Sequence, residues 1–317
     1  MIAWFQRALV ATWLLVVVGL LIHLTIRGPT VATMAWLFVL TFGHPMVLAV
    51  EFAMMVFVNR HEPVAKPRVR EVISAWFLEC LHALKVFAWW QPFRSRAQPD
   101  VKPRRPSALR GVVLVHGLVC NRGLWHDWLV RLRSLEVPAI AVDLEPPWGP
   151  IETYVDTIER AVARIESLTG LPPVIVAHSM GGLAARCWWR TSAASRVHRL
   201  ITLGTPHHGT VLARLGLSPN VCQMRDGSAW LRNLATSEGS EHLARMTCFF
   251  SVCDNIVFPA TCATMPGADN RQLVGTAHVH MVSHPEPWTE TLKHLDPSAG
   301  SPAEGSRAST PPSARAV

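Results

Sequence analysis

The feature that most restricts the fold of this chain is a long apolar segment at its N-terminus. Residues 8–26 carry no formal charge, and residues 31–58 carry only Glu51. About 20 apolar residues in a row are enough for a helix to cross a bilayer. A Gly-Pro pair lies between the two runs, so we predict two transmembrane helices within residues 1–60, joined as a hairpin. A cleaved leader is the alternative, but the first run is long for a leader and a second follows it at once.

Basic residues flank this predicted hairpin unequally. Arg7 precedes it and four basic residues follow it within residues 60–70, whereas Arg27 alone lies between the runs. The positive-inside rule therefore places both ends in the cytoplasm. Residues 72–90 are apolar enough for a third span, but Glu79 and two other polar residues interrupt them, which favours an amphipathic helix in the membrane interface. If this segment spanned instead, the rest of the chain would lie on the other side of the membrane.

Charge and composition restrict the kinds of partner that the chain is expected to bind. Half of the 317 residues are hydrophobic, and the net charge is +8, from 30 Lys and Arg against 22 Asp and Glu. Many basic residues lie beside apolar segments or in the tail, so we predict a membrane surface as partner and no nucleic acid. Residues 61–110 combine the interfacial helix with a basic, Pro-rich linker that is expected to be extended and exposed from residue 91. Residues 296–317 are rich in Pro, Ala and Ser, and are predicted to be disordered.

Short apolar runs alternate with amphipathic helical stretches between residues 111 and 295. Strands are predicted at residues 111–115, 139–143, 173–177, 200–203, 248–252 and 272–275. Helices are predicted at residues 122–135, at residues 151–168 and from residue 181 onward. Apolar strands that alternate with helices form a parallel sheet with helices on both faces. The sequence therefore predicts an α/β domain over this region.

One of these strands leads directly into a reactive side chain. Residues 174–183 read V-I-V-A-H-S-M-G-G-L, a buried strand followed by a turn at Ser179 and then a helix. Small residues such as Ala177 and Gly181 let the backbone turn sharply, which presents the hydroxyl at the edge of the sheet above a helix N-terminus. Ser179 is therefore the candidate nucleophile, supported by Ala177, His178 and Gly181. The alternative is a tight strand-to-helix turn without chemistry.

A second loop follows the first predicted strand, at His116 and Gly117. Attack on a carbonyl creates an oxyanion that two backbone N–H groups stabilise. We expect one of these from the loop, at Leu118, and the other from the residue after the nucleophile, Met180. His116 and Gly117 would support the loop. In the alternative interpretation, Gly117 only ends a strand.

A serine nucleophile also needs a base and an acid from later in the chain. Asp254 follows an apolar, strand-like segment, whereas nothing strand-like precedes the weaker candidate Asp226. His278 follows a predicted strand and lies in a Gly-bearing loop, where His280 and His284 compete for the same role. A neutral imidazole would take the serine proton while the carboxylate fixes its tautomer.

Metal ligands and disulfides are not indicated. His207, His208, His278 and His280 do not form a set with the three or four ligands and the geometry that zinc requires, so we predict no metal and no cofactor. The seven cysteines are odd in number and include no C-x-x-C pair. An oxidising compartment would allow one bridge among the last four, but scattered buried thiols fit equally well.

Taken together, four motifs resemble those of bacterial triacylglycerol lipases and related esterases of the α/β-hydrolase superfamily. They are VLVHGLVCNRGLW, AHSMGG, TLGTPHHGT and DNIVFPATCATMPGADN with VGTAHVHM, and the resemblance covers about residues 111–295. Ala177 replaces the first Gly of the usual G-x-S-x-G turn, a replacement that one branch of these lipases shares. The resemblance implies an α/β-hydrolase fold with a catalytic triad and an oxyanion hole. These groups would be Ser179, Asp254 and His278, with Leu118 and Met180 as oxyanion donors.

The resemblance also implies the reaction. A carboxylic ester of a lipid or another acyl ester would be cleaved through an acyl-enzyme, with residues 205–247 as a candidate lid over the site. The predicted hairpin lies outside the resemblance and would place the enzyme in a bacterial inner membrane as a multi-pass protein. An acyltransferase, a thioesterase or an amidase would use the same triad. A non-catalytic membrane scaffold that kept the fold is the remaining alternative.

Overall fold

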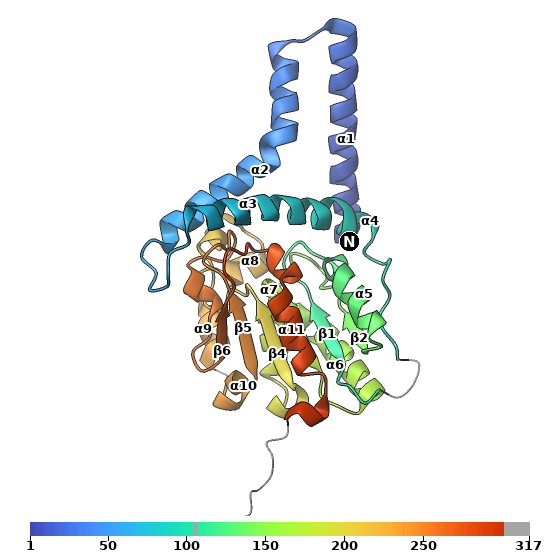
Figure 1. Cartoon of the computed structure of the whole chain (residues 1–317), viewed down its shortest axis with the longest axis vertical. Coiled ribbons are helices and arrows are strands. Elements are labelled where there is room, and N and C mark those ends of the chain that lie inside the picture. The colour runs from blue at the N-terminus through green and yellow to red at the C-terminus, as the bar shows by residue number, and fades with distance from the viewer. Residues whose placement is uncertain (104–106, 237, 301–317) are drawn as a thin grey trace, which may run out of the picture.

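The chain forms an N-terminal group of apolar helices and an α/β domain beneath them (Figure 1). A computed structural model describes residues 1–103, 107–236 and 238–300. Of the tail predicted to be disordered, residues 301–317 lie outside the described residues, as do residues 104–106 of the linker, whereas residues 297–300 form a short 3-10 turn. The α/β-hydrolase fold predicted for residues 111–295 is confirmed.

Three N-terminal helices are long and apolar enough to cross a membrane, judged by length and composition. They are α1 (Ile2–Arg27), α2 (Val31–Asn59) and α3 (Val69–Ala83), the last continued by η1 (Leu84–Trp90) and α4 (Gln91–Phe93). The first two stand as a hairpin away from the domain, and α3 lies across the top of the domain (Figure 1). Pro45 lies inside α2 and cannot donate a helical hydrogen bond, which accounts for the bend of that helix.

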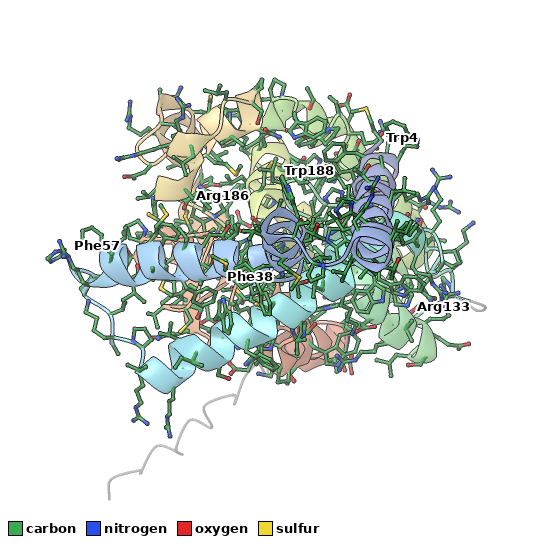
Figure 2. The ribbon with its side chains drawn as sticks, turned by 90° about the horizontal axis from the view of Figure 1, so that it is seen from above. Trp4, Phe38, Phe57, Arg133, Arg186 and Trp188 are labelled. Carbon is green, nitrogen blue, oxygen red and sulfur yellow. The ribbon has the colours of Figure 1, made fainter. Side chains whose placement is uncertain are left out.

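The second half of α2 and α3 cross the domain close to each other when seen from above (Figure 2). The Trp76 indole of α3 donates a hydrogen bond to the Pro45 carbonyl of α2 at 2.9 Å. The linker that follows α3 is not fully exposed, contrary to the prediction. Gln91 and Val101 are buried, and Val101 pairs with Ala139 in an antiparallel bridge. The apolar side chain of Val101 thus extends the core at the edge of the sheet.

The domain is built on a six-stranded parallel sheet. Its strands are β1 (Val112–Val115), β2 (Ala139–Ala141), β3 (Val174–His178), β4 (Arg199–Leu203), β5 (Met246–Phe250) and β6 (Asp269–Gln272), in the order β2-β1-β3-β4-β5-β6. The first five lie where predicted, within two residues. The sixth begins three residues early, because this edge strand reads D-N-R-Q and has no apolar run to reveal it.

Helices cover both faces of the sheet, as predicted. Successive strand residues point to opposite faces, so Val113 and Ile175 pack with α6 (Val155–Thr169) and α7 (Met180–Trp189). Leu114 and Val176 pack with α5 (His126–Ser134) and α11 (Pro285–Lys293) on the other face. Short 3-10 turns precede two of these helices: η2 (Arg122–Trp125) before α5 and η3 (Ile151–Tyr154) before α6.

Residues 205–245 form short helices between β4 and β5. They are η5 (Val211–Leu215), α8 (Pro219–Gln223), α9 (Ala229–Thr236) and α10 (Ser240–Ala244). Other short turns are η4 (Ala194–Arg196), η6 (Ala260–Ala263), η7 (His280–Ser283) and η8 (Pro297–Gly300). All seven cysteines are free, and six of them are buried. The turn η7 contacts α3, so this part of the carboxyl edge of the sheet faces the N-terminal helices.

Candidate active site

Ser179 occupies the single residue between β3 and α7. Its φ of 56° and ψ of −131° are rare for a residue with a side chain. Backbone bonds hold this conformation on both sides: Ser179 N donates to Leu203 O at 2.9 Å, and Gly182 N donates to Ser179 O at 3.0 Å. The turn predicted from the sequence is therefore present and is backed by β4.

Crowding explains why small residues surround this turn. A Cβ added to Gly181 would lie 2.5 Å from His116 O, and one added to Gly182 would lie 2.1 Å from Thr205 Oγ1. Neither position accepts a side chain without displacement of backbone or of a buried threonine. The start of α7 is consequently pressed against the loop after β1, which carries the predicted oxyanion donor.

Asp254 and His278 are joined by a hydrogen bond. His278 Nδ1 lies 3.0 Å from Asp254 Oδ2, and both side chains are buried. Asp254 Oδ1 accepts from the backbone N–H groups of Ile256 and Val257, each at 2.9 Å. Because the carboxylate is fixed by these donors, the proton of a neutral His278 belongs on Nδ1. Nε2 is then the nitrogen able to accept a proton.

His278 lies beside the strand that carries Ser179. Its ring centroid is 4.6 Å from that of His178, the residue before the serine, and His178 Nε2 donates to His278 O at 3.0 Å. Among the described residues, no hydrogen bond joins the Ser179 hydroxyl to His278. In uncomplexed enzymes such bonds are often long and tighten when substrate binds.

Buried charges set the protonation of His278. Burial alone lowers the pKa of His278, but the negative charges of Asp254, Glu79 and Glu51 outweigh it and hold the pKa above its ordinary value. The pKa of His178 lies well below its ordinary value because of burial and the nearby charge of His278. The surroundings thus stabilise an imidazolium at His278 and a neutral ring at His178.

Two backbone N–H groups next to the serine have no protein acceptor. Those of Leu118 and Met180 donate no hydrogen bond within the described part of the chain. Met180 begins α7, where the helix dipole favours negative charge. His116 fixes the Leu118 loop, since its Nε2 accepts from Leu144 N at 3.0 Å and its Nδ1 donates to Gly117 O at 2.9 Å.

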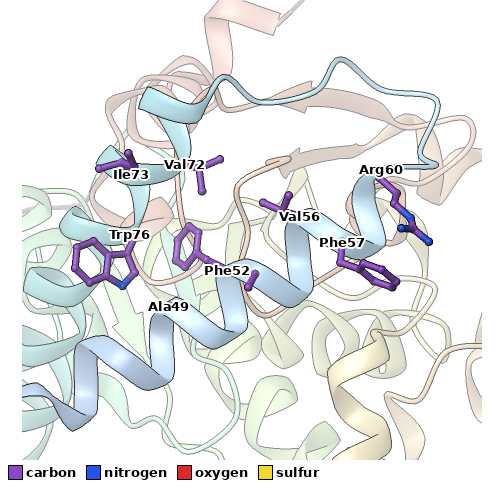
Figure 3. Close-up of a pocket in the computed structure, with 9 residues that line it drawn as sticks. Ala49, Phe52, Val56, Phe57, Arg60, Val72, Ile73 and Trp76 are labelled. Carbon is purple, nitrogen blue, oxygen red and sulfur yellow. The ribbon is translucent and has the colours of Figure 1, made fainter.

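A cavity of about 320 Å³ opens at Ser179 and is almost entirely apolar. Its walls come from the loop after β1, from the segment between β4 and β5 and from the loop after β5. The lining residues are Leu118, Ser179, Pro206, Thr210, Leu212, Ala213, Leu215, Gly216, Val221, Met224, Ile256 and Val257. A groove of about 590 Å³ between α2 and α3 contains none of the predicted site residues (Figure 3).

The weaker candidates lie elsewhere. Asp226 forms an ion pair with Arg214 at 3.7 Å, and the His280 ring stacks with His82 and also faces that of His284. His207 is held between Arg186 and Thr202 in a buried network, so it has a structural role. Within the residues that the structure describes, no group of three or more His, Cys, Asp or Glu is placed to hold a metal ion.

Sequence reasoning missed several residues that shape this site. Gly204, after β4, has a φ of 54°, and a Cβ there would lie 2.8 Å from Asp254 Oδ2. Asn255 Oδ1 accepts from His278 N at 3.3 Å. Glu79 and Glu51 reach the same loops from α3 and α2. Glu79 and Glu51 stand out in the sequence as isolated acidic residues in apolar helices, but the sequence does not indicate what they contact.

Comparison with known proteins agrees with this architecture. Residues 112–273, about half of the chain, match the model of the alpha/beta hydrolase family. The mature form of the lipase BlEst2 from Bacillus licheniformis is similar at 19% identity and a TM-score of 0.54, over 61% of this chain and 95% of that chain. Its propeptide form gives 20% identity and a TM-score of 0.52, over 62% of this chain and 52% of that chain. At these identities the likeness supports the fold alone.

No curated protein sequence matches the chain at a significant level. The family match, the parallel sheet and the serine at the strand-to-helix turn nevertheless agree with one another. This chain belongs to the alpha/beta hydrolase family.

Proposed function

We propose that this chain is a membrane-anchored serine hydrolase that cleaves carboxylic esters of lipids or of other acyl chains. The observation that carries the proposal is the placement of Ser179. It lies in a strained turn at the wall of an apolar cavity, beside a strand end where Asp254 and His278 are already hydrogen-bonded. A structural serine has no need of a rare backbone conformation, which costs about 1–3 kcal/mol.

The proposed reaction proceeds in two halves. His278 Nε2 takes the proton of the Ser179 hydroxyl as the oxygen attacks the ester carbonyl, and Asp254 stabilises the imidazolium that forms. The N–H groups of Leu118 and Met180 donate to the oxyanion. His278 then gives its proton to the departing alcohol, which leaves the acyl group on Ser179. Water, deprotonated by His278, attacks this acyl-enzyme. The bond from the acyl carbon to the Ser179 oxygen breaks, that oxygen takes the proton from His278, and the acid is released.

The cavity favours an acyl chain as the group bound beside Ser179. Apart from the serine and threonine hydroxyls, its side chains are aliphatic or sulfur-containing, so a hydrocarbon tail is the ligand that they fit best. Residues 205–224 supply most of this wall, in the region predicted as a lid. Acyl transfer to another alcohol, a thioester or an amide would use the same groups, so product analysis has to distinguish these reactions from hydrolysis.

We further infer that α1 and the first half of α2 are the membrane anchor, and that α3 lies at the membrane surface. Buried residues of α3, among them Ala75, Glu79 and Ala83, pack on the domain. A helix packed in this way cannot cross the bilayer while the domain remains in water. The N-terminus and the domain then lie on the same side, the cytoplasmic side by charge bias.

The test is hydrolysis of p-nitrophenyl esters of increasing chain length by the full-length protein in detergent micelles. We expect Ser179→Ala to lose at least about 10⁴-fold in kcat and all labelling by a fluorophosphonate probe. Ser134→Ala, at the exposed end of α5, is the control and should behave as wild type. Equal labelling of Ser179→Ala and wild type, or no hydrolysis of any ester by wild type, would refute the proposal.

A further inference from the structure

Each N-terminal helix sends at least one polar side chain to a loop of the candidate active site. Glu51 is the only formal charge in the second apolar run, and Glu79 interrupts the third. Ionisable residues in apolar helices are costly and are retained where they have a specific partner. Here the partners are neither lipid nor solvent, because both carboxylates bond to the domain.

Glu79 of α3 holds the chain immediately after His278. Its Oε1 accepts from Val279 N at 2.8 Å, and its Oε2 accepts from His280 N at 3.0 Å. The Glu79 residue is only 1% exposed, and no Lys or Arg forms an ion pair with it among the described residues. Its two oxygens therefore satisfy backbone donors that lie outside any strand. Without it, these buried N–H groups would lack an acceptor.

Glu51 of α2 is linked to the backbone of His278 through Asn255. Its Oε2 accepts from Asn255 Nδ2 at 2.8 Å, and Asn255 Oδ1 accepts from His278 N at 3.3 Å. Asn255 is buried and directly follows Asp254. The Glu51 carboxyl group thus orients an amide that links the loop of the proposed acid to the backbone of the proposed base.

Two further polar side chains of the N-terminal helices, Asn59 and Gln6, bond to loops of the candidate active site. Asn59, at the end of α2, donates to Val252 O at 3.2 Å and accepts from Ala260 N at 3.0 Å, on either side of the Asp254 loop. Gln6 of α1 is buried and donates to Val119 O at 3.2 Å, next to the proposed oxyanion donor Leu118.

We propose that Glu79 and Glu51 are positioning residues for His278, so that the N-terminal helices complete the active site as well as anchor the chain. This inference rests on the proposed function. Neither carboxylate touches the substrate site; each holds the main chain from which His278 projects. Because a misplacement of about 1 Å can cost about 100-fold in rate, loss of these bonds should act on kcat.

The two glutamates also act on His278 through charge. The ionisable groups that face its ring are Asp254 from the loop after β5, Glu79 from α3, Glu51 from α2 and His178 from the end of β3. The charges of the three carboxylates raise the pKa of His278. Burial raises the pKa of Glu79 itself to about 7, so its charge acts in full only above that pH. The proposed reaction needs this histidine neutral, so activity should fall on acidification through that pKa. Removal of one negative charge lowers the pKa and moves this acid limb to lower pH.

The experiment compares Glu79→Gln with wild type in full-length protein in micelles, by kcat, KM and the pH profile of kcat/KM. The glutamine keeps the shape but offers one acceptor oxygen in place of two. We expect kcat to fall about 10- to 100-fold with KM nearly unchanged, and the acid limb to move to lower pH. Glu71→Gln is the matched control on the same helix, since among the described residues the Glu71 carboxylate binds only Arg68, through its backbone N–H and an ion pair at the helix start. It should match wild type.

Each outcome decides the question. Unchanged kcat and pH profile in Glu79→Gln overturn the inference, and so does a fall in kcat without movement of the acid limb, which would indicate a merely structural role. If Glu79→Gln does not fold, Glu51→Gln replaces it, because that variant keeps an acceptor for Asn255. If the acid limb of the kcat/KM profile of Glu51→Gln stays at the wild-type pH, the inference is overturned. If that limb moves to lower pH, the inference is supported. A wild type that is not labelled at Ser179 refutes the proposed function instead.

Discussion

Gly117 limits how closely the loop after β1 can approach the serine turn. A Cβ at this position would lie 2.7 Å from Ser179 Cβ and 3.1 Å from His178 O. The loop after β1 can therefore approach the serine only if residue 117 has no side chain. This closeness brings the loop that carries Leu118 against the serine turn, so Gly117 is expected to act on the proposed oxyanion hole although it contributes no functional group.

We predict that Gly117→Ala lowers kcat by about 100-fold, because the added methyl group moves either the serine or the loop away from the other. The measurement is the rate of p-nitrophenyl ester hydrolysis, with the melting temperature recorded in parallel. Gly239→Ala is the control, since nothing lies within 4 Å of a Cβ there and the backbone needs no positive φ. A Gly117→Ala enzyme with wild-type kcat would show that the loop does not set the reactive geometry.

At the scale of elements, the sequence predicts what depends on local pattern. The buried strand β1 is apolar throughout, and β3 is apolar up to its last residue, His178. The turn at Ser179 has small residues of its own, so the strands and the turn can be predicted from neighbouring positions. The bounds of strand β6 cannot be predicted from local pattern, because its side chains are polar and half exposed. The contact of Glu79 with Val279 joins residues 200 positions apart, and no local pattern encodes such a pair. The proposed roles of Asp254 and His278 rest on their place after predicted strands and on the family resemblance, and they stay predictions.

The segment between β4 and β5 is the element whose function is most open to test. Leu215 of η5 lines the cavity yet is 74% exposed, so it contributes little to the core. We predict that Leu215→Ala lowers kcat/KM for long-chain esters by about three- to tenfold and leaves short-chain esters unaffected, because it removes contact with the distal part of the chain.

Leu217→Ala is the matched control for this prediction, since Leu217 is 88% exposed and does not line the cavity. The readout is the ratio of kcat/KM for a long-chain ester to that for a short-chain ester. An unchanged ratio in Leu215→Ala would mean that the acyl chain binds elsewhere, for instance along the groove between α2 and α3.

At the scale of the whole molecule, the hairpin and the domain are joined by specific polar contacts as well as by a linker. Hydropathy alone predicts α1 and α2, because an apolar run of sufficient length is a local property. Hydropathy does not decide whether α3 crosses the membrane, because Val69–Phe93 is also long and apolar enough for a membrane span. The packing of α3 on the domain favours the interfacial position, and that position places the carboxyl ends of the strands toward the membrane (Figure 1).

This arrangement predicts which sites share a side of the membrane. In a Cys222→Ser background, which removes the one cysteine that is not buried, a cysteine is introduced at Pro29, Ala65 or Val130. These sites report the hairpin tip, the loop between α2 and α3, and the domain. In sealed vesicles, a membrane-impermeant maleimide should label Ala65→Cys and Val130→Cys from the same side and Pro29→Cys from the other, because one span, α2, separates the tip from both. Labelling of Pro29→Cys together with Val130→Cys would contradict the hairpin. Labelling of Ala65→Cys and Val130→Cys from opposite sides would show that α3 crosses the membrane, and the bonds of Glu79 to the domain would then not exist in the bilayer.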